Sequence, residues 1–457
     1  MKLITISLFI ISLMHMAVDS YAQDSNSKAL NITLYQNGFG MVHDKRGLEI
    51  SQGTSIIDIG NLPRDIISES VFADFDGQII EQSFNSRETY WPEAIYKHLV
   101  DQSIRLVSEN GELVEGVLRS YKHGQIWLED SDGEFIFIQN AHSYRLHSSI
   151  NPDILSTSPQ LTWTIESEED GLQDVSIYYQ VGNMRWSADY NLVLDEDEES
   201  MDLHVKATMT NHSGIEYPDA RIRLVSGDLN VQPRQQMSRR DVGGAEMMKM
   251  NYADVAPETM FEYHVFDLPE RITLNDQEQK QITLKRASGI EAHKHYRYQT
   301  GPLGQLQRNN NKVDVEFRLA NTEEFKLGTP LPAGIVKVYQ KADERVEFIG
   351  EDQLEHTPVD QDFTISVGQA FDVIVEEKQV RLAELSNRVR EEDREITITN
   401  QKEQDITVEV ELRLNQNEEL RSSSIQGKEV EARRYIFDVP VEAESKETLS
   451  LQLRRSN

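Results

Sequence analysis

The chain has 457 residues, enough for about two to four domains with separate cores. Hydrophobic residues make up 38% and charged residues 27%, which excludes both a wholly disordered chain and a polytopic membrane protein. The 46 lysines and arginines stand against 78 aspartates and glutamates, a formal net charge of −32 that disfavours nucleic acid and anionic membranes as partners. The absence of cysteine excludes disulfides, thiolate metal sites and cysteine nucleophiles.

The first 22 residues predict a secretory signal peptide. Lys2 precedes the apolar run LITISLFIISLM, and the small residues Ser20 and Ala22 occupy the −3 and −1 positions of a cleavage site. This run is shorter than the ~20 apolar residues of a spanning helix, and no span is predicted in the mature chain. The alternatives are an N-terminal strand or a retained anchor. We expect cleavage after Ala22 and a periplasmic or secreted protein.

Most of the remaining chain alternates with a period of two, so the predicted fold class is mainly β, with several β-sandwich domains. Residues 28–100 are predicted to form an N-terminal β domain, in which Trp91-Pro92 opens a short helix. Residues 101–149 contain five short strand patterns, three tight turns and a bend at Gly116. This segment predicts a small inserted barrel of the SH3- or Sm-like kind.

Two further β-sandwiches are predicted at 158–233 and 261–379, followed by a C-terminal β region at 380–457. Residues 234–260 lack periodicity and contain Gly243-Gly244, which predicts a flexible linker. The segment 379–394 is ambiguous, because its apolar spacing nearly fits a helix whereas its neighbours are strands. No repeat with a period of about 20–50 residues is found.

Two weak metal sites can be considered. In a strand, His293 and His295 would share one face, a geometry that can bind zinc, but no third ligand is evident. The alternative is an exposed strand with polar tips. The carboxylate run Asp195–Glu199 can bind calcium weakly, although a turn that faces water is the simpler interpretation.

The sequence contains few other patterns that indicate a ligand or a catalytic site. The methionines at 247, 248 and 250 offer thioether ligands for Cu(I), within a stretch where methionine is also simply tolerated. No G-x-S-x-G elbow, H-E-x-x-H pair, P-loop or Rossmann glycine pattern occurs. A glycosidase-type carboxylate pair cannot be recognised without a fold. No catalytic residue and no cofactor are therefore predicted.

Three long stretches resemble one bacterial family. They are Leu34–Pro63, Tyr178–Asp228 and Leu327–Glu376, with motifs such as YYQVGNMRWSADYNLVL and LGTPLPAGIVKVYQ. They resemble proteins with the domain of unknown function 4139, including the mucoidy-inhibitor-A-like group. The resemblance implies secreted or envelope-located β-sandwich proteins with no established activity and no agreed catalytic residues. Some relatives have a coiled coil where this chain has the predicted small barrel.

Three functional hypotheses remain, in decreasing order of preference. The first is an extracytoplasmic envelope protein that acts as a non-catalytic binding or scaffold module for an envelope protein or polymer. The second is a glycan or peptide hydrolase with an unrecognised carboxylate pair, which a pocket with buried acids would favour. The third is metal handling through His293 and His295. The ligand, the oligomeric state and the pathway are not predicted.

Overall fold

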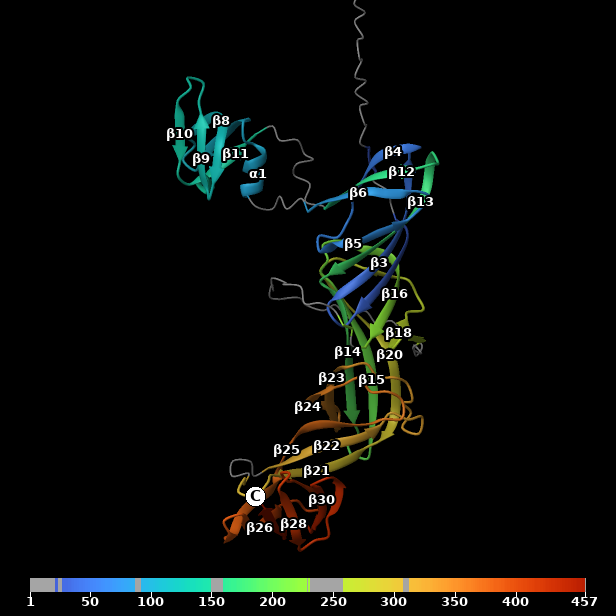
Figure 1. The fold of residues 1–457 in the computed structure, drawn as a ribbon, viewed down its shortest axis with the longest axis vertical. Helices are drawn as coiled ribbons and strands as arrows, with labels where there is room; N and C mark the ends of the chain where they lie inside the picture. Colours follow the sequence, from blue (N-terminus) through green and yellow to red (C-terminus); the bar gives the residue numbers. More distant parts are fainter. Residues whose placement is uncertain are drawn as a thin grey trace, which may run out of the picture.

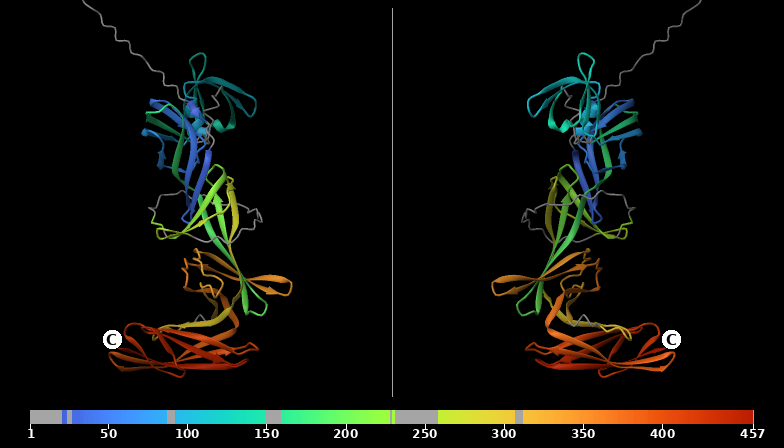
Figure 2. Two further views of the ribbon diagram at one scale, coloured as in Figure 1. Left: turned by 90° about the vertical axis from the view of Figure 1, so that its right-hand side faces the viewer. Right: turned by 90° about the vertical axis from the view of Figure 1, so that its left-hand side faces the viewer.

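The computed structural model describes residues 21–23, 27–86, 92–148, 159–227, 229–230, 258–306 and 312–456. The chain is 69% strand in five sheets, which confirms the mainly β class. Figure 1 shows the sheets arranged along an elongated molecule, and Figure 2 shows the C-terminal sheet lying across its far end. Within the described ranges, no helix is both long and apolar enough to cross a membrane.

Two sheets form the N-terminal part. The first is four-stranded, in the order β1 (Tyr21–Gln23), β4 (Gly53–Ile59), β12 (Gln160–Ser167), β6 (Gln78–Asn85). The second is eight-stranded, in the order β17 (Glu258–Met260), β18 (Tyr263–Asp267), β16 (Tyr217–Ser226), β2 (Ser27–Tyr35), β3 (Phe39–Ile50), β13 (Gly171–Gly182), β5 (Ile66–Asp74), with β19 (Ile272–Leu274) paired to β16. The predicted cleavage site after Ala22 falls within β1, and residues 1–20 lie outside the described residues.

A middle sheet of five strands continues the molecule. Its order is β20 (Glu278–Glu291), β15 (Ser200–Asn211), β14 (Met184–Leu194), β23 (Gly334–Ala342), β24 (Arg345–Leu354). Segments 28–100, 158–233 and 261–379 all contribute to one hydrophobic core, which joins this sheet to the two N-terminal sheets. The predicted domain boundaries stay a prediction. Of the predicted linker 234–260, residues 234–257 lie outside the described residues and the last three form β17.

The inserted unit lies to one side of the N-terminal sheets (Figure 1) and has a hydrophobic core of its own. It contains α1 (Pro92–His98), β7 (Ser103–Ser108), β8 (Leu113–Lys122), β9 (Gln125–Glu129), β10 (Phe135–Ile138), a 3-10 turn at Ala141–Ser143 and β11 (Tyr144–His147). All five predicted strands are present. Gly116 lies so close to β9 that a Cβ would be 2.7 Å from the Glu129 carbonyl oxygen.

No closed barrel is found among the described residues, so the expected SH3- or Sm-like barrel is corrected to an open sheet. The order is β10-β9-β8-β7-β11, which leaves β10 and β11 at opposite edges. Each edge strand has only four residues. The 3-10 turn that connects β10 to β11 is held by the loop between β8 and β9, because the Ala141 N–H donates to the Gly124 carbonyl at 2.7 Å.

The C-terminal sheet has nine strands and a second large core. Its order is β28 (Glu418–Ser423), β31 (Lys446–Ser456), β26 (Val389–Asn400), β25 (Asp362–Ser386), β22 (Lys312–Ala320), β21 (His293–Thr300), β27 (Ile406–Arg413), β30 (Arg434–Val441), β29 (Lys428–Glu431). The ambiguous segment 379–394 forms the end of β25, a turn at 387–388 and the start of β26, and the two strands pair with each other. The apolar stripe that imitates a helix remains half exposed, with Leu382 at 50% and Leu385 at 52%.

Three buried asparagines anchor strand ends in the same way. They are Asn211 at the end of β15, Asn321 just after β22 and Asn400 at the end of β26. Each side-chain amide donates to three backbone carbonyls, and each side-chain oxygen accepts one backbone N–H. These side chains satisfy the backbone groups that a strand leaves unpaired where it ends.

Candidate binding cleft

A cleft of about 700 Å³ lies where the turn between β14 and β15 meets the outer face of the C-terminal sheet. Its floor is formed by side chains that share the face opposite the core, on β21, β22, β27 and β30: His295, Arg318, Thr407, Glu409 and Asp438. Asp197 and Glu198 in the turn form one wall. Lys294, Gln404 and Asp405 complete the polar lining.

The acidic turn is fixed in place by lysines. The carboxylate of Asp195 contacts Lys341 Nζ at 2.6 Å, and the carboxylate of Glu198 contacts Lys294 Nζ at 2.5 Å. The Lys341 hydrogen bond lowers the pKa of Asp195. The interpretation of Asp195–Glu199 as a turn that merely faces water is therefore incomplete, because two of its acids attach it to β21 and β23.

Lys294 keeps its charge inside the cleft wall. Burial, the largest single influence, would lower the pKa of Lys294, but the hydrogen bond to Glu198, the charge of Glu198 and the contact with Tyr296 together outweigh it, and the pKa is raised. The ammonium group also lies 5.7 Å from the ring centre of Tyr296, within range of a cation–π attraction. Lys294 therefore stays charged, and its 2.5 Å contact with the Glu198 carboxylate fixes this wall of the cleft.

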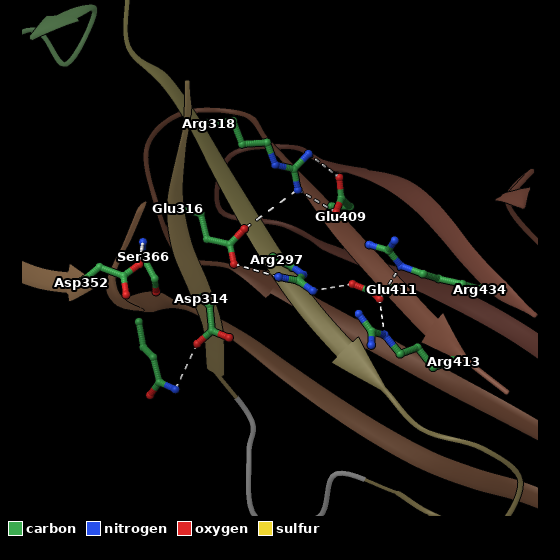
Figure 3. Close-up of polar contacts among 11 residues, drawn as sticks. Arg297, Asp314, Glu316, Arg318, Asp352, Ser366, Glu409, Glu411, Arg413 and Arg434 are labelled. Atoms are coloured by element: carbon green, nitrogen blue, oxygen red, sulfur yellow. Dashed lines mark hydrogen bonds and ion pairs between the residues drawn. The ribbon is translucent and has the colours of Figure 1, made fainter. Parts of the chain in front are cut away.

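The floor is held by a lattice of ion pairs across four strands (Figure 3). Arg318 binds the Glu409 carboxylate with two hydrogen bonds of 2.8 and 2.9 Å. Beside it, Arg297 bridges Glu316 at 3.0 Å and Glu411 at 2.5 Å. Two-pronged contacts of this kind fix the planes of the arginine side chains.

Glu411 is the centre of this lattice. Its side chain is fully buried, and its oxygens accept from Arg297, from Arg413 at 2.5 Å and from Arg434 at 2.7 Å. Burial alone would raise the pKa of Glu411, but the three guanidinium groups together lower it to about 2. The carboxylate is therefore a structural counter-ion and not a proton donor at neutral pH.

The two predicted histidines are on β21, as the zinc hypothesis required, but their surroundings differ. His295 lines the cleft, where burial and the nearby Arg318 lower its pKa. His293 lies 3.8 Å from a Glu291 oxygen and meets the ring of Phe325 edge-on. The described ranges contain no group of three or more side chains suited to a metal ion, so zinc binding stays a prediction. The three clustered methionines lie outside the described residues.

The cleft has an excess of open carboxylates. Glu198 and Glu409 are each occupied by a cation, Lys294 and Arg318 respectively. Asp438 lies directly opposite Glu409 on the neighbouring strand and has no hydrogen-bond or ion-pair partner in the described part of the chain. The arrangement is thus a preformed charged surface with acceptors that remain available to a ligand.

The sequence does not reveal this cleft, because its parts come from separate segments near residues 197, 294, 318, 405 and 438. The alternation of Glu409, Glu411 and Arg413 along β27 places three charges on one face. This is the ordinary pattern of a strand with one solvated face, so it gives no local signal of the cleft.

The cleft lies within a region of the chain that matches a known protein family. The family described as "Domain of unknown function (DUF4139)" matches residues 175–454, more than half of the chain. The match runs from β13 to near the end of β31, so every cleft residue lies within it. No curated protein matches the chain. The protein belongs to the DUF4139 family.

Proposed function

We propose that the protein is an extracytoplasmic envelope protein that acts as a non-catalytic binding or scaffold module. The observation that carries this proposal is the cleft, whose paired charges are fixed before any ligand arrives. The predicted signal peptide supports the location, and the resemblance to the mucoidy-inhibitor-A-like group agrees with it. Paired sheets arranged as sandwiches would supply the scaffold.

Preformed charges favour binding over chemistry. A binding surface gains affinity when its side chains are already ordered, because ordering them on association costs free energy. Arg318 and Lys294, which line the cleft, are ordered by ion pairs on neighbouring strands, and Arg297 beside them is held in the same way. A general acid, by contrast, requires a carboxyl group isolated from such cations.

A second surface supports the same proposal. On the open sheet of the inserted unit, the rings of Trp127 and Phe137 lie 4.7 Å apart and are 44% and 45% exposed. Neighbouring Phe135 is 61% exposed. Exposed aromatic clusters of this kind are typical of shallow interaction surfaces.

Partner capture tests the proposal. The mature chain is used as bait in envelope extracts, beside two charge-reversal variants, Asp438→Lys in the cleft and Glu270→Lys at an exposed position between β18 and β19, outside the cleft and the inserted unit. We expect one partner to be lost with Asp438→Lys and retained with Glu270→Lys. A partner profile that is identical for all three baits would contradict a role for the cleft.

A hydrolase is the second candidate, because five acids line one cleft: Asp197, Glu198, Asp405, Glu409 and Asp438. It predicts turnover of glycan or peptide substrates by the purified protein. Asp405→Asn and Asp438→Asn are the informative variants, since neither acid is paired with a cation in the described residues. Turnover that disappears in either variant would replace the binding proposal.

A further inference from the structure

We propose that the cleft receives a segment of a partner protein that carries lysine or arginine. The inference rests on the proposed binding function and specifies its chemistry. The charge balance of the lining supports it first. Lys294 is paired with Glu198 and Arg318 with Glu409, and no other lysine or arginine lines the cleft. Three carboxylates therefore remain without a counter-cation in the described residues: Asp197, Asp405 and Asp438.

The position of Asp438 is the most informative. It lies directly across from Glu409 on the adjacent antiparallel strand, and like charges in such a pair destabilise a sheet. Arg318 neutralises Glu409 with both of its hydrogen bonds, which leaves Asp438 uncompensated. A local cost without a structural benefit is expected at a functional position. An external cation at Asp438 would remove that cost.

The remaining lining does not supply the missing charge. His295 is held towards its neutral form, because burial and Arg318 lower its pKa. The net charge of −32 adds a long-range attraction for cations and repels anions. A neutral ligand would leave all three open carboxylates uncompensated.

The dimensions favour side chains of a larger partner. A volume of about 700 Å³ matches the sites that hold a small ligand or a few side chains, and it is too small for a folded domain. Asp197, Asp405 and Asp438 are all exposed, so long basic side chains can reach them while the partner's main chain stays outside. Asp405 is pre-oriented, since it already accepts the Ala443 N–H at 2.8 Å.

The test uses the full mature chain and a short fluorescent lysine-rich peptide at low salt, read by fluorescence anisotropy. The controls are the same peptide with norleucine in place of lysine, and a free linear tetraamine. We expect the lysine peptide to bind at least about tenfold more tightly than the norleucine peptide. Asp438→Asn should weaken that binding about fivefold or more, and Asp132→Asn should not change it.

Asp197→Asn, on the opposite wall, provides a second variant in case Asp438→Asn perturbs the sheet. Equal binding of the lysine and norleucine peptides, or unchanged binding in both cleft variants, would overturn the inference. Tetraamine binding as tight as peptide binding would show that the ligand is a small amine and not a protein segment. Partner capture that still depends on the cleft, without peptide binding, would refute this inference while leaving the proposed function intact.

Discussion

Replacing Asn400 by alanine tests how the C-terminal sheet is held together. The Asn400 amide donates to the carbonyls of Gln404 at 2.8 Å, Glu442 at 3.1 Å and Val441 at 3.4 Å, and its oxygen accepts the Lys402 N–H at 3.0 Å. Each bond contributes about 1 kcal/mol, and a buried group left unpaired costs about 1–3 kcal/mol. Because water can reach some of these partners, we expect a loss of about 3–4 kcal/mol.

A local assay reports on the C-terminal sheet directly, whereas a chain with separate hydrophobic cores commonly unfolds in more than one step. Hydrogen–deuterium exchange, read by mass spectrometry on peptides from β26, β27 and β30, reports the free energy of opening of that sheet. Asn415→Ala is the matched control, since the Asn415 side chain is exposed. Similar exchange in the two variants would refute the anchoring role of Asn400. Replacing Asn211 or Asn321 by alanine should likewise speed exchange in the strands that each one anchors.

Three further substitutions test the packing and the ion pairs. Glu411→Gln should destabilise the C-terminal sheet by about 2 kcal/mol at pH 7. This is less than the free energy that corresponds to the lowered pKa of Glu411, because Arg413 is exposed and water screens its charge. Since the pKa of Glu411 is lowered from 4.5 to about 2, its stabilisation is complete above pH 4.5 and lost as the pH falls towards 2, so melting curves of wild type and variant should converge there. Arg394→Met removes the cation that contacts two buried carboxylates, those of Glu377 and Glu392, and should cost about 3–5 kcal/mol by hydrogen exchange; a smaller loss than in the Glu411 variant would contradict this. Gly334→Ala puts a Cβ 2.0 Å from the Ala188 carbonyl oxygen and should lower the melting temperature or the soluble yield, whereas unchanged melting would show that β14 and β23 can separate freely.

The strands were predictable because their burial alternates along the sequence. In β12, Leu161, Trp163 and Ile165 point into the core while the residues between them do not. The structure of segment 379–394 could not be predicted, because the spacing of its apolar residues fits a helix. The strand conformation depends on the pairing between β25 and β26, which the local sequence does not show. The sequence also could not show whether the inserted unit closes into a barrel, because closure depends on whether its edge strands β10 and β11 pair with each other.

The cleft could not be predicted for a related reason. Local patterns identified His295 and the acidic turn, but not that Lys294 would join them through Glu198. The register between β27 and β30, which brings Asp438 opposite Glu409, exists only once the sheet has formed. Sequence reasoning therefore found some of the participating groups and missed their arrangement.

The most direct test of the central claim, binding without chemistry, is mass spectrometry of a captured partner before and after incubation with the mature chain. The account predicts that the partner binds, is recovered with unchanged mass, and no longer binds Asp438→Lys. Recovery of a cleaved or otherwise modified partner would contradict it, as would undiminished binding to Asp438→Lys.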